Sequence, residues 1–190
     1  MTPLITALMG LFVLGGTGNQ GGWAAVNLPA AIIAAPAYEV TMTAYNAVPS
    51  QTDNDPYTTA SGAYSNPEIV AARSQDMADK LPFGTVIAIE PSDTSDPSCG
   101  YPVVANSVGL RVIADTMNAR MHQKVDLLFG TENTVTLAGG RQVNAATAFG
   151  VCNDVKIIVL GHIDIAKLPK TQTELAHMIT GTGPSLAVAN

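Results

Sequence analysis

The chain has 190 residues, 47% of them hydrophobic and 13% charged, which supplies enough apolar material for one well-buried domain with short appendages. The formal net charge is −6, and the nine basic residues are scattered along the sequence. Because phosphate backbones are bound by clustered Lys and Arg side chains, this composition argues against a nucleic-acid partner. The sequence gives no indication of an oligomeric state.

The first 37 residues contain no charged side chain and are predicted to be a signal peptide. Their apolar run LITALMGLFVLGG (4–16) is shorter than the roughly 20 residues that a membrane-spanning helix needs, so no stable membrane span is expected. The sequence APA (35–37) has the small-x-small pattern of a signal-peptidase site. We therefore expect a secreted, periplasmic or cell-wall-associated protein. No Lys or Arg precedes the apolar run, which leaves a packed or disordered leader as the alternative.

From residue 39 onward the hydrophobic pattern mostly has period two, which is typical of β-strands. Strands are predicted at 39–46, 69–72, 82–91, 124–130 and 155–163, and the segment 101–117 is interpreted as two more strands around a glycine. Residues 38–163 are thus predicted to form a mainly β domain, a small barrel of six to seven strands.

The remaining segments are predicted to be loops and short helical turns. The polar segment 51–68 is rich in turn-forming residues and is expected to be a long ordered loop, a common location for substrate contacts. Short helical turns are predicted at 74–81 and within 131–150. A C-terminal tail over 164–190 is expected to contain one short helix, 171–180.

Cys99 and Cys152 are the two cysteines of the chain. In an exported protein they could form a disulfide between the loop 91–102 and the start of the last predicted strand. In a cytosolic protein they would more often be free thiols. The sequence leaves both alternatives open.

Two acids stand inside otherwise apolar strands, Asp115 in VIADTM and Asp126 in KVDLLF, eleven residues apart. An ionised carboxylate is costly to bury, so such acids are usually paired, protonated or exposed in a cleft. If the link 116–123 brings the two strands together, both carboxyls would face one groove, and one pKa would rise enough for general-acid catalysis. Alternatively, each Asp caps a turn or pairs with a basic residue, Arg111, Arg120 or Lys124.

Several further residues are candidates for contacts with a sugar. Hydroxyl and aromatic side chains suit carbohydrate, and they occur on the first strand and the following loop at Thr43, Tyr45, Thr59 and Ser61, together with Gly62. These residues are equally compatible with ordinary strand and turn composition. The three histidines lack the spacing of metal ligands, so neither a metal nor another cofactor is expected.

Four groups of residues resemble, in this order, the 3D domain, a family of cell-wall proteins named for three aspartates. They are VTMTAYN with SQTDNDPYTTASG (40–62), IVAA with LPFGTVIAI (69–89), VIADTMNAR with KVDLLF (112–129), and AFGV with VKIIVL (148–160). The resemblance covers residues 40–160, and its most specific part is the segment that contains Asp115 and Asp126.

The resemblance implies a six-stranded double-psi β-barrel of the RlpA-like and MltA-like type, and lytic transglycosylase activity on peptidoglycan glycan strands. In that reaction an Asp protonates the glycosidic oxygen and then accepts the proton of the muramyl 6-hydroxyl, which closes a 1,6-anhydro ring. By position, Asp126 is expected to be this acid/base. Asp115 is expected to tune its pKa or to stabilise the cationic transition state.

Two positions depart from the family pattern. Arg73 stands where the first family aspartate is expected, and Val86 stands where many members have a Lys. Arg73 could contact substrate, or it could form a salt bridge with one acid and lower its pKa. Asp53 and Asp55 are candidates for a substitute third carboxylate. The alternatives to a lytic enzyme are a non-catalytic glycan-binding module of the same fold and a glycoside hydrolase acting on a related β-1,4-glycan.

Overall fold

The computed structural model describes residues 35–53, 55–90 and 96–181. Most of the predicted signal peptide and the end of the C-terminal tail lie outside these residues. None of the described helices is long and apolar enough to cross a membrane.

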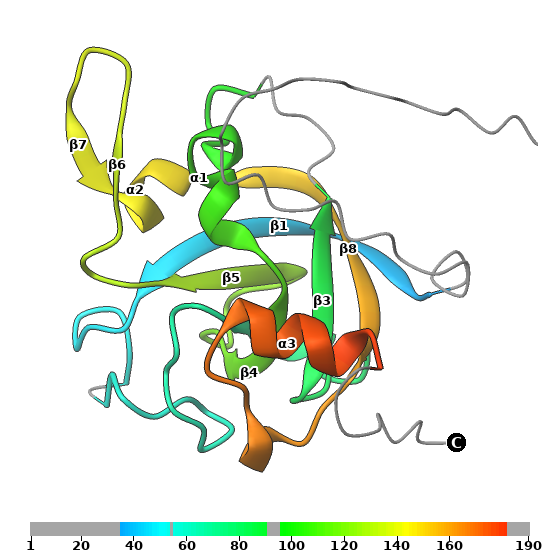
Figure 1. Ribbon diagram of the computed structural model, residues 1–190. Helices are drawn as coiled ribbons and strands as arrows, with labels where there is room; N and C mark the ends of the chain where they lie inside the picture. Colours follow the sequence, from blue (N-terminus) through cyan, green and yellow to red (C-terminus); the bar gives the residue numbers. More distant parts are fainter. Residues whose placement is uncertain (1–34, 54, 91–95, 182–190) are drawn as a thin grey trace, which may run out of the picture.

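Six strands form a closed barrel, which confirms the predicted mainly β fold (Figure 1). In chain order they are β1 (Ala37–Asn46), β2 (Val70–Arg73), β3 (Thr85–Glu90), β4 (Arg111–Thr116), β5 (Lys124–Phe129) and β8 (Cys152–His162). Around the barrel the order is β1-β5-β2-β4-β3-β8, with β8 closing against β1. Closure leaves no free edge among these six strands.

The barrel consists of two interlocked halves, β1-β2-β3 and β4-β5-β8. Exchanging β1 with β4, β2 with β5 and β3 with β8 leaves every neighbour relation unchanged. The two parallel pairs, β1 with β5 and β2 with β4, each join one strand from each half. This crossed arrangement is the double-psi topology. It makes the β1–β2 connection and the β4–β5 connection equivalent elements on the same barrel.

Short helices cover the barrel. Helices α1 (Tyr101–Val108) and α2 (Ala145–Phe149) pack together through Tyr101 and Phe149, whose ring centroids are 6.5 Å apart. Helix α3 (Gln172–Ile179), predicted at 171–180, buries Leu175 against another part of the core. A 3₁₀-helix, η2 (Gln75–Met77), follows β2, and a second, η3 (Ile165–Lys167), follows β8. The hairpin β6 (Thr134–Thr136) and β7 (Gln142–Asn144) extends from the barrel.

The prediction of two strands within 101–117 is wrong for its first half, which is helix α1. The helix begins after Gly100, has a Pro in its first turn, and ends at Gly109, whose φ is +55°. Val104 and Val108 lie four residues apart on its buried face. Packing against the barrel and α2 therefore overrides the β preference of valine.

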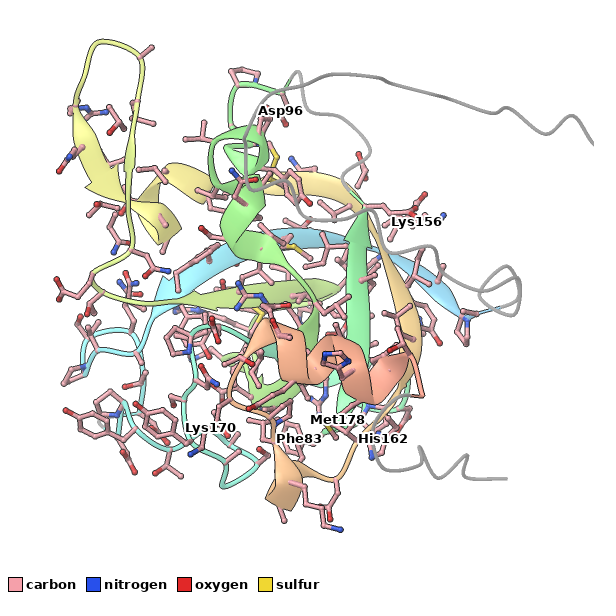
Figure 2. The ribbon with its side chains drawn as sticks, viewed as in Figure 1. Phe83, Asp96, Lys156, His162, Lys170 and Met178 are labelled. Carbon is pink, nitrogen blue, oxygen red and sulfur yellow. A yellow bond between two sulfur atoms is a disulfide. The ribbon has the colours of Figure 1, made fainter. Side chains whose placement is uncertain are left out.

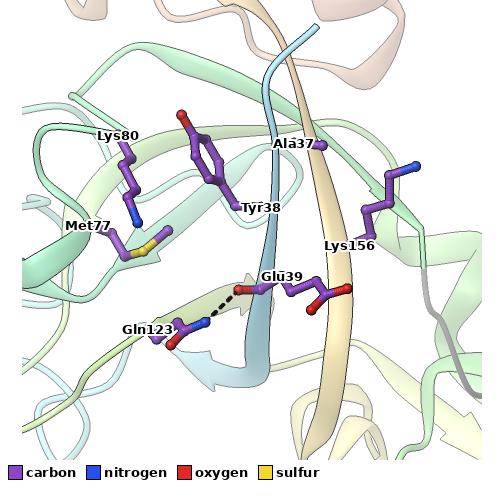
Figure 3. Close-up of a pocket in the computed structure, with 7 residues that line it drawn as sticks. All are labelled: Ala37, Tyr38, Glu39, Met77, Lys80, Gln123 and Lys156. Atoms are coloured by element: carbon purple, nitrogen blue, oxygen red, sulfur yellow. Dashed lines mark hydrogen bonds between the residues drawn. The ribbon is translucent and has the colours of Figure 1, made fainter. Parts of the chain in front are cut away.

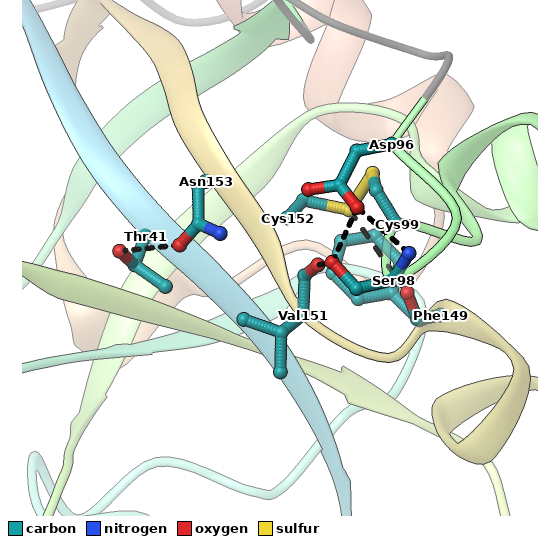
Figure 4. Close-up of a disulfide and its surroundings, with 8 residues drawn as sticks. All are labelled: Thr41, Asp96, Ser98, Cys99, Phe149, Val151, Cys152 and Asn153. Carbon is teal, nitrogen blue, oxygen red and sulfur yellow. Dashed lines mark hydrogen bonds between the residues drawn. A yellow bond between two sulfur atoms is a disulfide. The ribbon is translucent and has the colours of Figure 1, made fainter.

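Cys99 and Cys152 form a disulfide, so of the two alternatives for the cysteines the bridged one is correct (Figure 4). The backbone also pairs here: Gly100 N–H donates to Phe149 O, and Val151 N–H donates to Ser98 O. Asp96 Oδ1 accepts hydrogen bonds from the Ser98 backbone and hydroxyl, which orders the turn before α1 (Figures 2 and 4). The disulfide thus fastens this turn to the start of β8.

Candidate active site

A groove of about 520 Å³ opens between the β1–β2 connection and the β4–β5 connection. The β1–β2 connection supplies one wall and the β4–β5 connection the other, and strand residues form the floor. Its lining residues are Tyr45, Gln51, Thr52, Asp53, Thr58, Ala60, Ser65, Ala72, Gln75, Asp115, Thr116, Met117, Asn118, Met121 and Asp126.

Asp115 and Asp126 both line this groove, as predicted, although their strands are not neighbours. The link 116–123 does not pair β4 directly with β5, because β2 lies between them. Ala72 on β2 is the register partner of Asp115 on one side and of Asp126 on the other. Since directly paired residues share a sheet face, the two carboxylates lie on either side of one methyl group.

Asp126 has an environment suited to a general acid. Its pKa is raised to about 6, mainly by burial and also by the nearby charge of Asp115. A hydrogen bond from Thr43 Oγ1 to Oδ1, 2.8 Å long, and the charge of Lys124 act in the opposite direction. The net result is a carboxyl that exchanges a proton close to neutral pH.

Asp115 is held by three donors. Its Oδ2 accepts from the Tyr45 hydroxyl at 2.8 Å, and its Oδ1 accepts from the backbone N–H groups of Ala60 at 2.8 Å and Thr116 at 2.9 Å. Tyr45 is only 9% exposed, and burial, followed by the charge of Asp115, raises its pKa well above the ordinary value. Tyr45 therefore remains a hydrogen-bond donor, and Asp115 is fixed in place as an acceptor.

The predicted loop residues divide between the groove and the turn that supports it. Asp53 lines the groove, whereas Asp55 accepts from Tyr57 N–H, and hydrogen bonds led by one from the Thr58 side chain lower its pKa. The Thr59 and Ser61 hydroxyls bond each other at 3.0 Å. Gly62, with φ of +82°, closes this turn.

This supporting turn is anchored to β4. Ser61 N–H donates to Ala114 O, next to the bond from Ala60 to Asp115. Thr59, Ser61 and Gly62 are not among the groove-lining residues. These three residues therefore contact the site only indirectly, through Asp115 and strand β4.

Arg73 is buried outside the groove lining, on the opposite side of β2 from Ala72. Its guanidinium donates to Leu81 O at 2.9 Å and lies 4.9 Å from the centre of the Phe83 ring. The salt bridge between Arg73 and a groove acid that the sequence suggested does not form. Val86, the second departure, is fully buried in the core.

The predicted alternative of Asp–Arg or Asp–Lys pairing also fails, since neither groove carboxylate is in an ion pair within the described residues. Arg111 is fully buried and donates to backbone carbonyls, including Val108 O at 2.6 Å and Leu128 O at 3.0 Å. Desolvation lowers its pKa to about 10. Arg111 therefore stabilises the loops and strands behind the site.

The sequence prediction missed several groove residues, among them Gln51, Thr58, Ser65 and Asn118 on the two connections and Gln75 on η2. Their polar character within turn-rich segments was the available signal, but it does not distinguish a groove wall from a solvent-facing loop. Among the described residues, no cluster of His, Cys, Asp and Glu is arranged to hold a metal ion.

Comparison with known proteins yields no assignment: no protein-family model matches the chain, and no curated protein matches it significantly.

Proposed function

We propose that this protein is a lytic transglycosylase of the 3D domain type that cleaves peptidoglycan glycan strands. The observation that carries the proposal is Asp126, a carboxyl with a pKa of about 6 that lines an open groove together with Asp115. Cleavage of a glycosidic bond requires a carboxylic acid that is protonated near neutrality and a second carboxylate near the cationic transition state.

The proposed reaction uses Asp126 twice. Its proton moves to the glycosidic oxygen as the bond from that oxygen to C1 breaks, and positive charge develops on the sugar ring. The muramyl 6-hydroxyl oxygen then bonds to C1, and its proton returns to Asp126. The products are two shorter strands, one of which ends in a 1,6-anhydromuramyl residue, and no water is consumed. Asp115, held by Tyr45 and two backbone N–H groups, stabilises the positive charge.

An exported location forms part of the proposal. The disulfide between Cys99 and Cys152 supports it, because disulfides persist in oxidising compartments such as the periplasm and the cell surface. The cell wall lies in the same compartments.

Mass spectrometry of soluble products tests the proposal. Purified peptidoglycan is incubated with the wild-type chain, with Asp126→Asn, and with Asp164→Asn, a matched control at the N-cap of η3, where an Asn can retain the capping role. We expect anhydromuropeptides from the wild type and the control and none from Asp126→Asn. Reducing ends from the wild type would replace the proposal with a glycoside hydrolase. Binding to the wall without any released product would replace it with a glycan-binding module.

A further inference from the structure

A second pocket, of about 480 Å³, lies near the start of β1 (Figure 3). It is lined by Ala37, Tyr38, Glu39, Met77, Lys80, Gln123 and Lys156, none of which lines the groove. Its chemistry differs from that of the groove because two lysines line it, whereas no Lys or Arg lines the groove.

Two chain segments, 75–77 and 121–123, each contribute residues to both the groove and the second pocket, and we call these two segments the ridge. Helix η2 contributes Gln75 to the groove and Met77 to the second pocket. The β4–β5 connection contributes Met121 to the groove and Gln123 to the second pocket. The Cα atoms of residues two positions apart are at most about 7 Å from each other, so the ridge is at most about 7 Å wide.

Gln123 fixes this ridge to its surroundings. Its backbone N–H donates to Asp76 Oδ2 at 2.9 Å, and its side-chain amide donates to Glu39 O at 3.1 Å (Figure 3). Its φ is +51°, a conformation that is uncommon for residues other than glycine. Such backbone strain persists where the surrounding contacts determine it, and it is concentrated at functional sites.

Lys80 places an ammonium group at the second pocket. Its ammonium lies 5.6 Å from the centre of the Tyr38 ring, and both side chains lie on the same side of β1 in Figure 3. Lys156, across the strand, is paired with Glu90 at 3.0 Å. The Glu39 side chain points to that same far side, toward β8 (Figure 3). The near side thus combines an exposed ammonium, an aromatic wall and a side-chain amide.

We propose that the second pocket binds the stem peptide carried by the muramyl residue in the groove, with Lys80 paired to a stem carboxylate. This inference rests on the proposed function, because it takes the glycan in the groove to be peptidoglycan. A stem of three to five residues spans up to about 10–18 Å when extended, which is enough to cross the ridge. A charge-assisted hydrogen bond to Lys80 and packing on Tyr38 are the contacts that select it.

The test compares binding to intact sacculi with binding to sacculi from which an amidase has removed the stem peptides. Lys80→Gln removes the ammonium, and Lys167→Gln on η3 makes the same change at an exposed lysine outside both pockets. We expect Lys80→Gln to weaken binding to intact sacculi about fivefold to tenfold, as loss of one charge-assisted bond predicts, and to leave binding to denuded glycan unchanged. Lys167→Gln should affect neither.

Titration of a synthetic stem pentapeptide, followed by NMR, separates this inference from the proposed function. Shifts of Tyr38 and Gln123 resonances that are lost in Lys80→Gln would support the pocket even if the chain released no glycan. Cleavage of sacculi with equal efficiency by wild type and Lys80→Gln, and no response to the pentapeptide, would overturn the pocket and leave the catalytic proposal intact. Equal weakening on intact and denuded sacculi would also overturn it.

Discussion

At the scale of single residues, the site depends on the different surroundings of two identical side chains. Asp126 is half-buried and has one side-chain donor, Thr43, whereas Asp115 has three donors. The sequence predicted both acids and their common groove. It did not predict which donors hold each one, because Ala60 is 55 positions and Tyr45 is 70 positions from Asp115. Tyr45, expected to bind sugar, is a groove-lining residue that also positions this carboxylate.

The raised pKa of Asp126 leads to a prediction for stability and rate. In the folded chain the pKa is about 6, against the ordinary value of 3.8. Between these two pH values the folded state binds more protons, so the free energy of unfolding decreases as pH rises from about 4 to about 6, by up to roughly 3 kcal/mol. Above this window the rate of glycan cleavage should also fall, because the acid loses its proton.

Urea denaturation of wild type and Asp126→Asn at a series of pH values measures the effect. Other groups titrate in both proteins, so the difference between the two curves isolates Asp126. Asp126→Asn should gain stability relative to wild type as pH rises through this window. A difference that does not change with pH would show that the carboxyl titrates normally.

At the scale of elements, the barrel strands were predicted from the sequence and the helix α1 was not. Strand periodicity is local, and all six barrel strands overlap predicted segments. Segment 101–108 contains three valines and resembles a strand, yet it packs as a helix against the barrel and α2. Pro102 and Gly109 were the helix signals in the sequence. The strand order was also beyond local pattern, since nothing in β4 or β5 indicates that β2 lies between them.

The disulfide gives the prediction that belongs to this scale. It joins residues separated by 53 positions, and loop entropy for that length corresponds to about 4 kcal/mol of stabilisation. The double variant Cys99→Ala/Cys152→Ala should therefore unfold with a free energy about 2–4 kcal/mol lower than wild type in chemical denaturation. Glycan cleavage under folding conditions should be preserved, because neither cysteine lines the groove.

A reducing agent provides the control for the disulfide. It should lower the stability of the wild type to that of the double variant and leave the double variant unchanged. If the reductant has no effect on wild-type stability, the bridge does not stabilise the fold in solution.

At the scale of the whole molecule, the closed barrel brings together two connections that are far apart in sequence. The β1–β2 connection and the β4–β5 connection are equivalent in the two halves, and both line the groove together with residues of the strands. Ala72 lies in this groove, 3% exposed, between the register partners Asp115 and Asp126. A substrate that contacts both carboxyls must pass over its methyl group.

Ala72→Val tests whether the glycan occupies this position. Valine is favoured in strands, so the barrel should fold, while its added methyl groups enter the space between the two acids. We expect kcat/KM for glycan cleavage to fall by about tenfold or more, because small displacements from reactive geometry are costly. Ala72→Ser, which adds one small polar atom, is the matched control and should retain most activity. Circular dichroism and thermal denaturation establish that both variants are folded. Full activity of folded Ala72→Val would mean that the scissile bond does not lie between Asp115 and Asp126, and the assignment of Asp126 as the acid would then have to be abandoned.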